Sequence, residues 1–295
     1  MPDFILGGAM KAGTTTVWSW LARHPDIGMP VAKEPRFFTG ERGLLDGGAP
    51  DAPLRSGRYG EGLPWYESLF QACAGKSVIG EASSRYLHAA DAAGLIRATL
   101  PQVRLIFVLR DPAERLYAHY RHEQRTLPGL PQFPKLVRDR HPRFARYLAD
   151  SSYGTQLGRF LSVFDRDRML LLLTEELEAD PAAAARRLFT FLGVDVPGDL
   201  SGLTARLNPA SVSRSRALNR WLTSRPRGHW AGRLPRPVAE LASRIRRKLV
   251  AANTVPEAPQ PLDPALRREL VDLLGPEIAL TERLLGRALP RWRAV

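Results

Sequence analysis

The run Arg104–Leu109, RLIFVL, constrains the fold of this chain more than any other feature. Five large apolar residues follow one another after Arg104, without the polar–apolar alternation of a strand that has one face in water. Continuous apolar runs are typical of strands buried on both faces of a parallel sheet. Similar runs occur at Phe4–Ala9, Ser77–Ala82 and Arg168–Leu173, with amphipathic segments such as Thr14–His24 and Tyr153–Phe164 between them. This alternation predicts an α/β fold with a central, mostly parallel sheet flanked by helices.

Asp-Pro pairs mark expected helix starts, because aspartate caps a helix N-terminus and proline favours the first turn. They occur at Asp111-Pro112, Asp180-Pro181 and Asp263-Pro264. We expect the first helix to reach about Glu123 and the second to stop at Gly193. The third is expected to end at Leu274, with a separate helix from Pro276 to about Leu285.

Irregular insertions are expected within what is predicted to be a single domain over residues 1–295. Residues 40–64 contain seven Gly and three Pro, and residues 126–142 are polar and rich in Pro. Insertions of this length in a compact domain are typical of lids or binding loops. Disordered insertions without a binding role are the alternative, and the sequence leaves this alternative open.

Positive charge is concentrated late in the chain. The net charge is +13, and residues 201–250 hold twelve Arg and Lys against one acid, Glu240. This loop-and-helix region suits phosphate groups, an acidic ligand or anionic lipid, or is a plain solvated surface. Aromatic residues are not interleaved as a base-stacking platform, so we expect no nucleic-acid partner. A weak peripheral membrane contact through residues 225–248 stays an expectation.

Cysteine usage and the first residues indicate the compartment. The chain has one cysteine, Cys73, which excludes an intrachain disulfide and a clustered-thiolate zinc site. The start MPDFILGGAMK lacks a basic region and an export cleavage pattern. A cytoplasmic location is therefore the prediction.

The segment Gly7–Thr16, GGAMKAGTTT, lies between the first expected strand and the first expected helix. A glycine-containing turn there presents backbone N–H groups at a helix N-terminus, where the helix dipole favours an anion. Lys11 adds a positive charge, and three threonines add hydroxyl donors. These features predict a phosphate-binding loop in a P-loop-like domain. A turn whose threonines only cap the helix is the alternative, but it leaves Lys11 without a role.

The loop differs from that of ATPases and kinases. A Walker A loop has lysine directly after its final glycine, whereas Lys11 stands two residues before Gly13. Those enzymes also need a carboxylate for Mg²⁺ at the end of a buried strand, and the run 104–109 is followed by Arg110. The sequence therefore favours a phosphate-bearing donor handled without a metal ion. A kinase-like phosphotransferase is the enzymatic alternative, and a basic membrane-surface or nucleic-acid binding protein is the non-enzymatic one.

Three motifs point to one family. They are Gly8–Thr16 followed by Leu21 and His24-Pro25, then Lys33–Phe38 (KEPRFF), then Val108–Arg115 (VLRDPAER). They resemble the 5′-phosphosulfate loop, the K-E-P-x-F-F segment and the 3′-phosphate site of sulfotransferases that use 3′-phosphoadenosine-5′-phosphosulfate (PAPS). The second motif is similar to the bacterial and Golgi-type carbohydrate branch. Further similarity extends to the segment Leu262–Trp292, so it covers nearly the whole chain.

The resemblance implies transfer of a sulfuryl group from PAPS to a hydroxyl, without a metal ion. The acceptor would be a sugar, a glycosylated natural product or another small molecule, and the released product 3′-phosphoadenosine-5′-phosphate (PAP). Lys11 is then expected to bind the donor and to neutralise leaving-group charge. Other expected donor contacts are Ala12, Gly13, Thr14, Thr15 and Thr16 at the 5′-phosphate, Arg110 at the 3′-phosphate, and Arg214 in a late loop. Ala118 replaces the serine usual in the family, which removes one hydroxyl contact worth about 0.5–1.5 kcal/mol.

Glu34 is the expected general base. Pro35 keeps Glu34 out of helical backbone, so we expect an extended segment. Phe37 and Phe38 are expected to surround the carboxylate and to raise its pKa. A surface ion pair with a neighbouring basic residue is the alternative role for Glu34.

Further site residues are expected around Glu34. His119 and His122 follow on the helix after Arg110, and we take His119 as a catalytic candidate, with a structural histidine as the alternative for each. Contacts to the acceptor are expected from Lys33, Glu81, Ser83 and Tyr86.

Overall fold

The computed structural model describes residues 1–31, 33–39, 57–127, 129–201, 249 and 260–295, and the backbone of 211–213 and 254–256. The chain divides into two compact units, residues 1–205 with 262–295, and residues 206–261. In the second unit, strands β6 (Ser211–Ser213) and β7 (Thr254–Pro256) pair antiparallel. Arg214, the segment 225–248 and most of the insertion 40–64 lie outside the described residues.

Five parallel strands form the sheet of the first unit. They are β1 (Phe4–Gly8), β2 (Ile27–Gly28), β3 (Val78–Ala82), β4 (Arg104–Leu109) and β5 (Met169–Leu173). Their order is β2-β3-β1-β4-β5, and every neighbouring pair is parallel. All of β1 and the last five residues of β4 are buried, as expected for strands covered on both faces. The predicted parallel α/β fold is confirmed.

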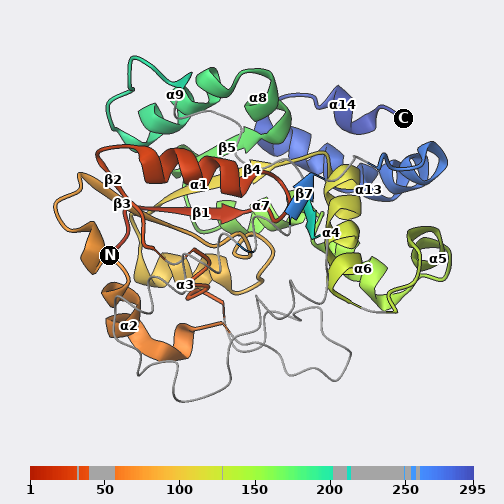
Figure 1. Cartoon of the computed structure of the whole chain (residues 1–295), viewed down its shortest axis with the longest axis horizontal. Coiled ribbons are helices and arrows are strands. Elements are labelled where there is room, and N and C mark those ends of the chain that lie inside the picture. The colour runs from red at the N-terminus through yellow and green to blue at the C-terminus, as the bar shows by residue number, and fades with distance from the viewer. Residues whose placement is uncertain are drawn as a thin grey trace. The chain divides into compact units, whose positions relative to one another are not determined.

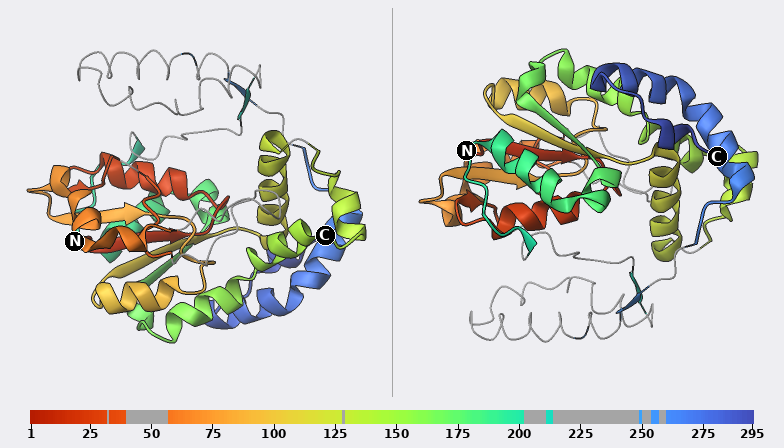
Figure 2. Two further views of the ribbon diagram at one scale, coloured as in Figure 1. Left: turned by 90° about the horizontal axis from the view of Figure 1, so that it is seen from below. Right: turned by 90° about the horizontal axis from the view of Figure 1, so that it is seen from above.

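Helices cover both faces of this sheet. Helices α1 (Thr14–Arg23) and α9 (Pro181–Leu192) lie on one face (Figure 1). The other face is covered by α3 (Ala92–Thr99), α7 (Tyr153–Leu161) and α13 (Pro264–Leu285), as Figure 2 shows from two sides. Helix α4 (Pro112–Thr126) stands at the carboxyl ends of the strands. The shorter helices are α2 (Gly62–Ser68), α5 (Phe133–Arg138), α6 (Pro142–Ala149), α8 (Thr174–Ala179) and α14 (Pro290–Arg293).

The Asp-Pro pairs start helices as predicted. The Asp111 carboxylate accepts from the N–H groups of Ala113 and Glu114, and that of Asp263 accepts from Ala265 and Leu266. Asp180 caps α9 in the same way, through the Ala183 N–H. These bonds satisfy donors that a helix N-terminus otherwise leaves without partners.

Two local predictions were wrong. Helix α13 runs without a break from Pro264 to Leu285, with Pro276 inside it. Proline removes one backbone hydrogen bond there, and packing of α13 on α7 offsets this loss. Helix α5 lies in the segment 126–142 that was expected to be irregular, because its apolar residues Phe133, Leu136 and Val137 are all buried. Among the described residues, no helix has both the length and the apolar character needed to span a bilayer.

Candidate active site

The loop between β1 and α1 presents a helix N-terminus. Gly13 has a φ of 92°, a left-handed conformation that glycine adopts without steric cost. Because glycine has no side chain, the N-terminus of α1 has no side-chain cap. The Ala12 N–H donates to the Ala9 carbonyl at 3.3 Å, and the Thr16 N–H donates to the Gly13 carbonyl at 2.9 Å. The N–H groups of residues 13–15 are therefore the candidates for binding an anion.

A pocket of about 310 Å³ opens beside this loop. Its lining residues are Met10, Lys11, Gly13, Thr14, Thr15, Lys33, Glu34, Arg36, Ser84, Arg85 and His122. Of the residues predicted to hold the 5′-phosphate, Ala12 and Thr16 are not part of this lining. Four cationic side chains and one carboxylate make the pocket strongly basic, which suits an anionic ligand.

Lys11 lies in positive surroundings. Burial, together with the Arg125 and Arg115 guanidinium groups, lowers the pKa of Lys11 to about 8. An anion bound in the pocket would favour the ammonium form and so raise this pKa again. The Lys11 charge is therefore coupled to the presence of an anionic ligand.

Lys33 lies next to the loop between β1 and α1. Its Nζ donates to Thr15 Oγ1 at 2.9 Å and lies 5.9 Å from the centre of the Trp18 ring. Burial lowers the pKa of Lys33. Lys33 was predicted to contact the acceptor; in the structure its ammonium group contacts Thr15 of the loop before α1, and both residues line the same pocket.

The Glu34 carboxylate faces the same pocket from a segment bonded to β3. Glu34 Oε1 accepts from the Ser84 hydroxyl at 2.7 Å and from the Ser84 N–H at 3.1 Å, and the Glu34 N–H donates to the Ala82 carbonyl at 2.8 Å. Glu34 Oε2 lies 3.8 Å from Arg36 Nε. These contacts hold Oε1 against Ser84, and Oε2 is buried beside Arg36.

The backbone and surroundings of Glu34 differ from the expectation. Its φ is 62°, in the left-handed region, rather than extended. Pro35 disfavours the right-handed helical conformation, but the bonds to Ala82 and Ser84 select the left-handed one. Phe37 and Phe38 do not surround the carboxylate, because both are buried in the core against Tyr66.

Glu81, Ser83 and Tyr86 form a buried network beneath the Glu34 segment instead of lining an acceptor pocket. All three are fully buried. The hydroxyls of Tyr66 and Tyr86 each donate to Glu81 Oε1 at 2.8 Å, and the Ser83 hydroxyl donates to Oε2 at 3.0 Å. Burial raises the pKa of Glu81 to about 7, although the three hydroxyl donors act in the opposite direction.

The same network holds the segment that carries Glu34. The Arg36 N–H donates to Ser83 Oγ at 3.0 Å, and the Phe38 N–H donates to the Tyr86 hydroxyl oxygen at 3.3 Å. Glu81, Ser83 and Tyr86 therefore fix the position of the segment that carries Glu34. Their polar type suggested a pocket, but their partners lie in the core.

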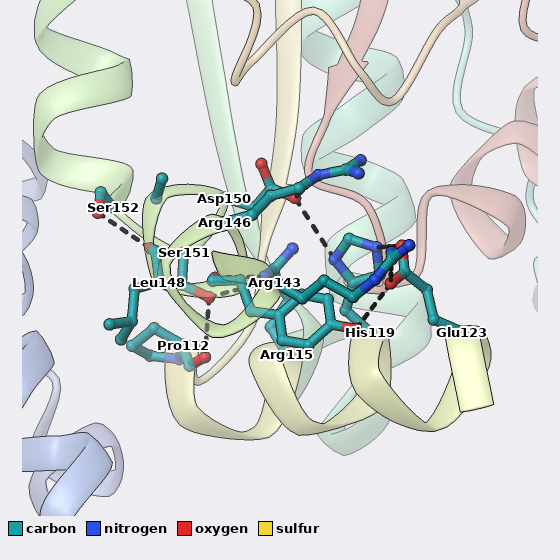
Figure 3. Close-up of polar contacts among 12 residues, drawn as sticks. Pro112, Arg115, His119, Glu123, Arg143, Arg146, Leu148, Asp150, Ser151 and Ser152 are labelled. Atoms are coloured by element: carbon teal, nitrogen blue, oxygen red, sulfur yellow. Dashed lines mark hydrogen bonds and ion pairs between the residues drawn. The ribbon is translucent and has the colours of Figure 1, made fainter. Parts of the chain in front are cut away.

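Of the two histidine candidates, His122 lines the pocket and His119 does not. His119 is 2% exposed, with Nε2 3.5 Å from Glu123 Oε1 and Nδ1 3.4 Å from Asp150 Oδ2, as drawn in Figure 3. Burial lowers the pKa of His119. His119 thus joins α4 to the end of α6, a structural position rather than the predicted catalytic one. Burial and the Lys11 ammonium lower the pKa of His122, so its ring is neutral at pH 7.

Arg110 lines a second pocket, of about 230 Å³. Its Nη2 lies 3.4 Å from Glu114 Oε2. The other lining residues are Asp111, Glu114, Thr174, Glu175, Glu178 and Arg291. Lys11 and Arg110, which were expected to hold one nucleotide, therefore line two separate pockets.

Strand order places these two pockets next to each other. The loop follows β1, Arg110 follows β4 and Thr174 follows β5, and these three strands are consecutive in the sheet. Thr174 Oγ1 lies 2.7 Å from the Ala12 carbonyl oxygen and 3.1 Å from the Leu109 carbonyl oxygen. The residue thus contacts the phosphate-binding loop and also lines the Arg110 pocket. A ligand with two phosphate positions would extend along this edge of the sheet.

Sequence reasoning missed Ser84, Arg85 and Arg36 as lining residues. Ser84 and Arg85 follow β3 directly, and the carboxyl end of a parallel strand is where ligands bind in open α/β sheets. That signal was present in the sequence, but it was assigned to Glu81, Ser83 and Tyr86. Arg36 was considered only as a possible ion-pair partner of Glu34, and the structure places Arg36 Nε 3.8 Å from Glu34 Oε2.

Comparison with known proteins places this geometry in a family. Residues 2–198 match the family model described as Sulfotransferase family. A sulfotransferase from Alicyclobacillus acidocaldarius superposes with a TM-score of 0.67 over 100% of this chain and 99% of that chain, at 26% identity. The sulfotransferase domain from the curacin biosynthetic pathway shares the fold, with a TM-score of 0.50 over 93% of this chain and 98% of that one, at 16% identity.

Curated relatives include larger enzymes. Heparan sulfate glucosamine 3-O-sulfotransferase 3B1 of Mus musculus is 30% identical over 203 residues, which cover 66% of this chain and 46% of that protein. The bifunctional heparan sulfate N-deacetylase/N-sulfotransferase 4 of Mus musculus is 26% identical over 211 residues, 66% of this chain and 22% of that protein. This chain thus spans less than half the length of these two relatives. Because the family model covers more than half of the chain, including the loop, Glu34 and Arg110, this protein belongs to the sulfotransferase family.

Proposed function

We propose that this protein is a PAPS-dependent O-sulfotransferase that transfers a sulfuryl group to an acceptor hydroxyl. The observation that carries the proposal is one basic pocket in which a lysine-bearing loop at a helix N-terminus faces a single carboxylate, Glu34. The loop suits the phosphosulfate group of a donor. The carboxylate suits the proton of an acceptor.

The donor would bind along the edge formed by β1, β4 and β5. The N–H groups of residues 13–15, with Lys11 and Lys33, would hold its 5′-phosphosulfate, and Arg110 would contact its 3′-phosphate. Support comes from the Lys33–Thr15 bond and from Thr174, which contacts the loop and lines the Arg110 pocket. Charge-assisted hydrogen bonds of this kind are about twice as strong as neutral ones.

The transfer would be an in-line displacement. The acceptor oxygen forms a bond to sulfur while the bond from sulfur to the bridging 5′-phosphate oxygen breaks. The electron pair of the broken bond stays on that phosphate oxygen, where the Lys11 ammonium neutralises the developing charge. The moving sulfuryl group carries less charge than a phosphoryl group, so the step is proposed to run without a divalent ion.

Glu34 would take the proton of the acceptor hydroxyl. Ser84 holds Oε1 with two hydrogen bonds, and Oε2 is buried 3.8 Å from Arg36 Nε. The proposed proton acceptor is this carboxylate, which lines the pocket. The acceptor itself is proposed to be a sugar or a glycosylated natural product, supported by the names of the curated relatives, which are heparan sulfate sulfotransferases.

Glu34→Gln tests the proposal. Wild-type protein should bind PAP in calorimetry and should release PAP from PAPS when hydroxylated sugars are screened as acceptors, in the presence of EDTA. The variant should bind PAP like the wild type but lose turnover by about 10²–10⁴-fold, the contribution of a positioned base. Glu67→Gln, an exposed carboxylate on α2, serves as the matched control and should keep full turnover. Absence of PAP binding by the folded wild type would refute the donor, and substantial turnover by Glu34→Gln would remove Glu34 from the role.

A further inference from the structure

The pocket that contains Arg110 has an electrostatic difficulty as a 3′-phosphate site. Four carboxylates line it, Asp111, Glu114, Glu175 and Glu178, and one of them, Glu114, contacts Arg110 itself at 3.4 Å. A dianionic phosphate bound in this pocket would be repelled by the carboxylates that line it unless other cations neutralise them. Arg110 alone is therefore a poor match for the anion that the proposed function puts there.

The C-terminal helix supplies a cation to two of these acids. Arg267, near the start of α13, places Nη2 2.6 Å from Asp111 Oδ2 and Nη1 3.5 Å from Glu114 Oε1. Its side chain is only 16% exposed, so water screens these ion pairs weakly. Arg267 thus neutralises the two acids next to Arg110. Arg267 also pairs with Glu114. When Arg110 turns from Glu114 to a phosphate, the Glu114 carboxylate therefore still has a cationic partner.

Arg267 also holds the final turn of the chain in place. Its Nε donates to the Ala294 carbonyl at 2.8 Å and its Nη2 to the Arg291 carbonyl at 3.2 Å. The buried Trp292 donates from its indole to Glu175 Oε1 at 3.1 Å, the oxygen that also accepts the Asp111 N–H at 2.9 Å. Helix α14 is therefore attached to the start of α4. This attachment brings Arg291 into the lining of the Arg110 pocket.

We propose that the C-terminal turn completes the 3′-phosphate subsite, with Arg291 contacting the phosphate and Arg267 positioning the turn and neutralising Asp111 and Glu114. The inference rests on the proposed function for its ligand. It assigns donor binding to residues beyond position 198, where the match to the family model ends.

The test compares two nucleotides that differ at the 3′ position. Calorimetry measures the dissociation constants of PAP and of adenosine 5′-monophosphate for the full chain, and the ratio of the two reports recognition of the 3′-phosphate. Arg291→Ala changes an exposed side chain and should leave folding intact. It should weaken PAP binding at least tenfold, as expected for a hydrogen bond to a charged group, and leave binding of the monophosphate within about twofold.

Arg293→Ala is the matched control. It lies in the same turn, is also exposed, pairs with Glu282 at 2.7 Å and does not line the pocket, so the nucleotide ratio should stay at the wild-type value. Arg267→Gln should reduce the ratio, and adding Glu114→Gln should restore part of it because one repelling carboxylate is then removed. A loss of packing alone would not produce this rescue, and thermal melting shows whether each variant is folded.

The outcomes separate this inference from the proposed function. A wild type that prefers PAP, together with Arg291→Ala and Arg267→Gln variants that keep the full preference, overturns the C-terminal subsite and leaves the proposed function standing. A folded wild type that does not bind PAP overturns both. A reduced nucleotide ratio in both variants, with Arg293→Ala unchanged, supports the subsite.

Discussion

Glu81→Gln should change how the stability of this protein depends on pH. Glu81 is fully buried, and burial raises the pKa of its carboxyl group from 4.5 to about 7. One pKa unit corresponds to about 1.4 kcal/mol, so ionising the native carboxyl costs about 3 kcal/mol more than ionising it in the unfolded chain. Glutamine keeps the shape and can accept from Tyr66 and Tyr86, but it does not titrate.

Proton linkage determines whether the free energy of unfolding rises or falls with pH. Below pH 4.5 the carboxyl is protonated in both states. Between about pH 4.5 and 7 the unfolded chain loses this proton while the native state keeps it, so the native state binds more protons and the free energy of unfolding falls as pH rises. Above about pH 7 both states are ionised, and the loss is complete. The free energy of unfolding of Glu81→Gln minus that of the wild type should therefore rise by about 3 kcal/mol between pH 4.5 and 7.5.

Urea unfolding at four pH values from 4.5 to 7.5 measures this difference, because other titrating groups contribute equally to both proteins and cancel. Glu67→Gln, which removes an exposed carboxylate of α2, is the control for the same substitution outside the core. A difference for Glu81→Gln that stays constant across this range refutes the reasoning. The carboxyl would then be no harder to ionise in the native protein than in the unfolded chain.

Two further predictions follow from the site and the core. The free-enzyme pKa of Lys11 is about 8, and its ammonium form is the one proposed to bind the donor. The kcat/KM for PAPS should therefore fall about tenfold per pH unit above pH 8, and a profile that is flat to pH 9.5 would contradict this. Gly154→Ala on α7 would place a Cβ 2.6 Å from Leu280 of α13, so it should cost about 1–3 kcal/mol in urea unfolding. Gly158→Ala on the same helix faces open space and should stabilise by about 0.5–1 kcal/mol; equal effects of the two changes would show that close packing of α7 and α13 is not decisive.

Much of the fold was predictable because its signals are local. A continuous apolar run is enough to indicate a strand buried on both faces, and the run 104–109 became β4 as expected. The Asp-Pro pairs started helices because the capping aspartate and the helix N–H groups lie within three residues of each other. Helix α13 was misjudged because the cost of Pro276 is local, whereas the packing on α7 that offsets it comes from residues more than a hundred positions away.

The candidate site was predictable in part. Lys11 and Glu34 line one pocket, because a loop after β1 and a segment bonded to β3 meet where neighbouring parallel strands end. His119 and His122 lie three positions apart on one helix, and composition could not distinguish which of them faces the pocket. Only the packing of α6 on α4 decides that His119 turns toward Asp150 and that His122 does not.

Residue order alone thus indicated the strands, the glycine-containing loop after the first strand and the position of Arg110 at a strand end, since each is a pattern among near neighbours in the chain. The tertiary structure alone decided which polar groups meet: Glu81 with Tyr66, the Glu34 carboxylate with Ser84, and Arg267 with Asp111, 156 residues earlier. The physical reason is range. Apolar runs and helix caps are patterns of nearby residues, whereas a hydrogen bond or ion pair between distant residues requires two atoms within about 3 Å of each other, and only the folded chain brings such residues that close.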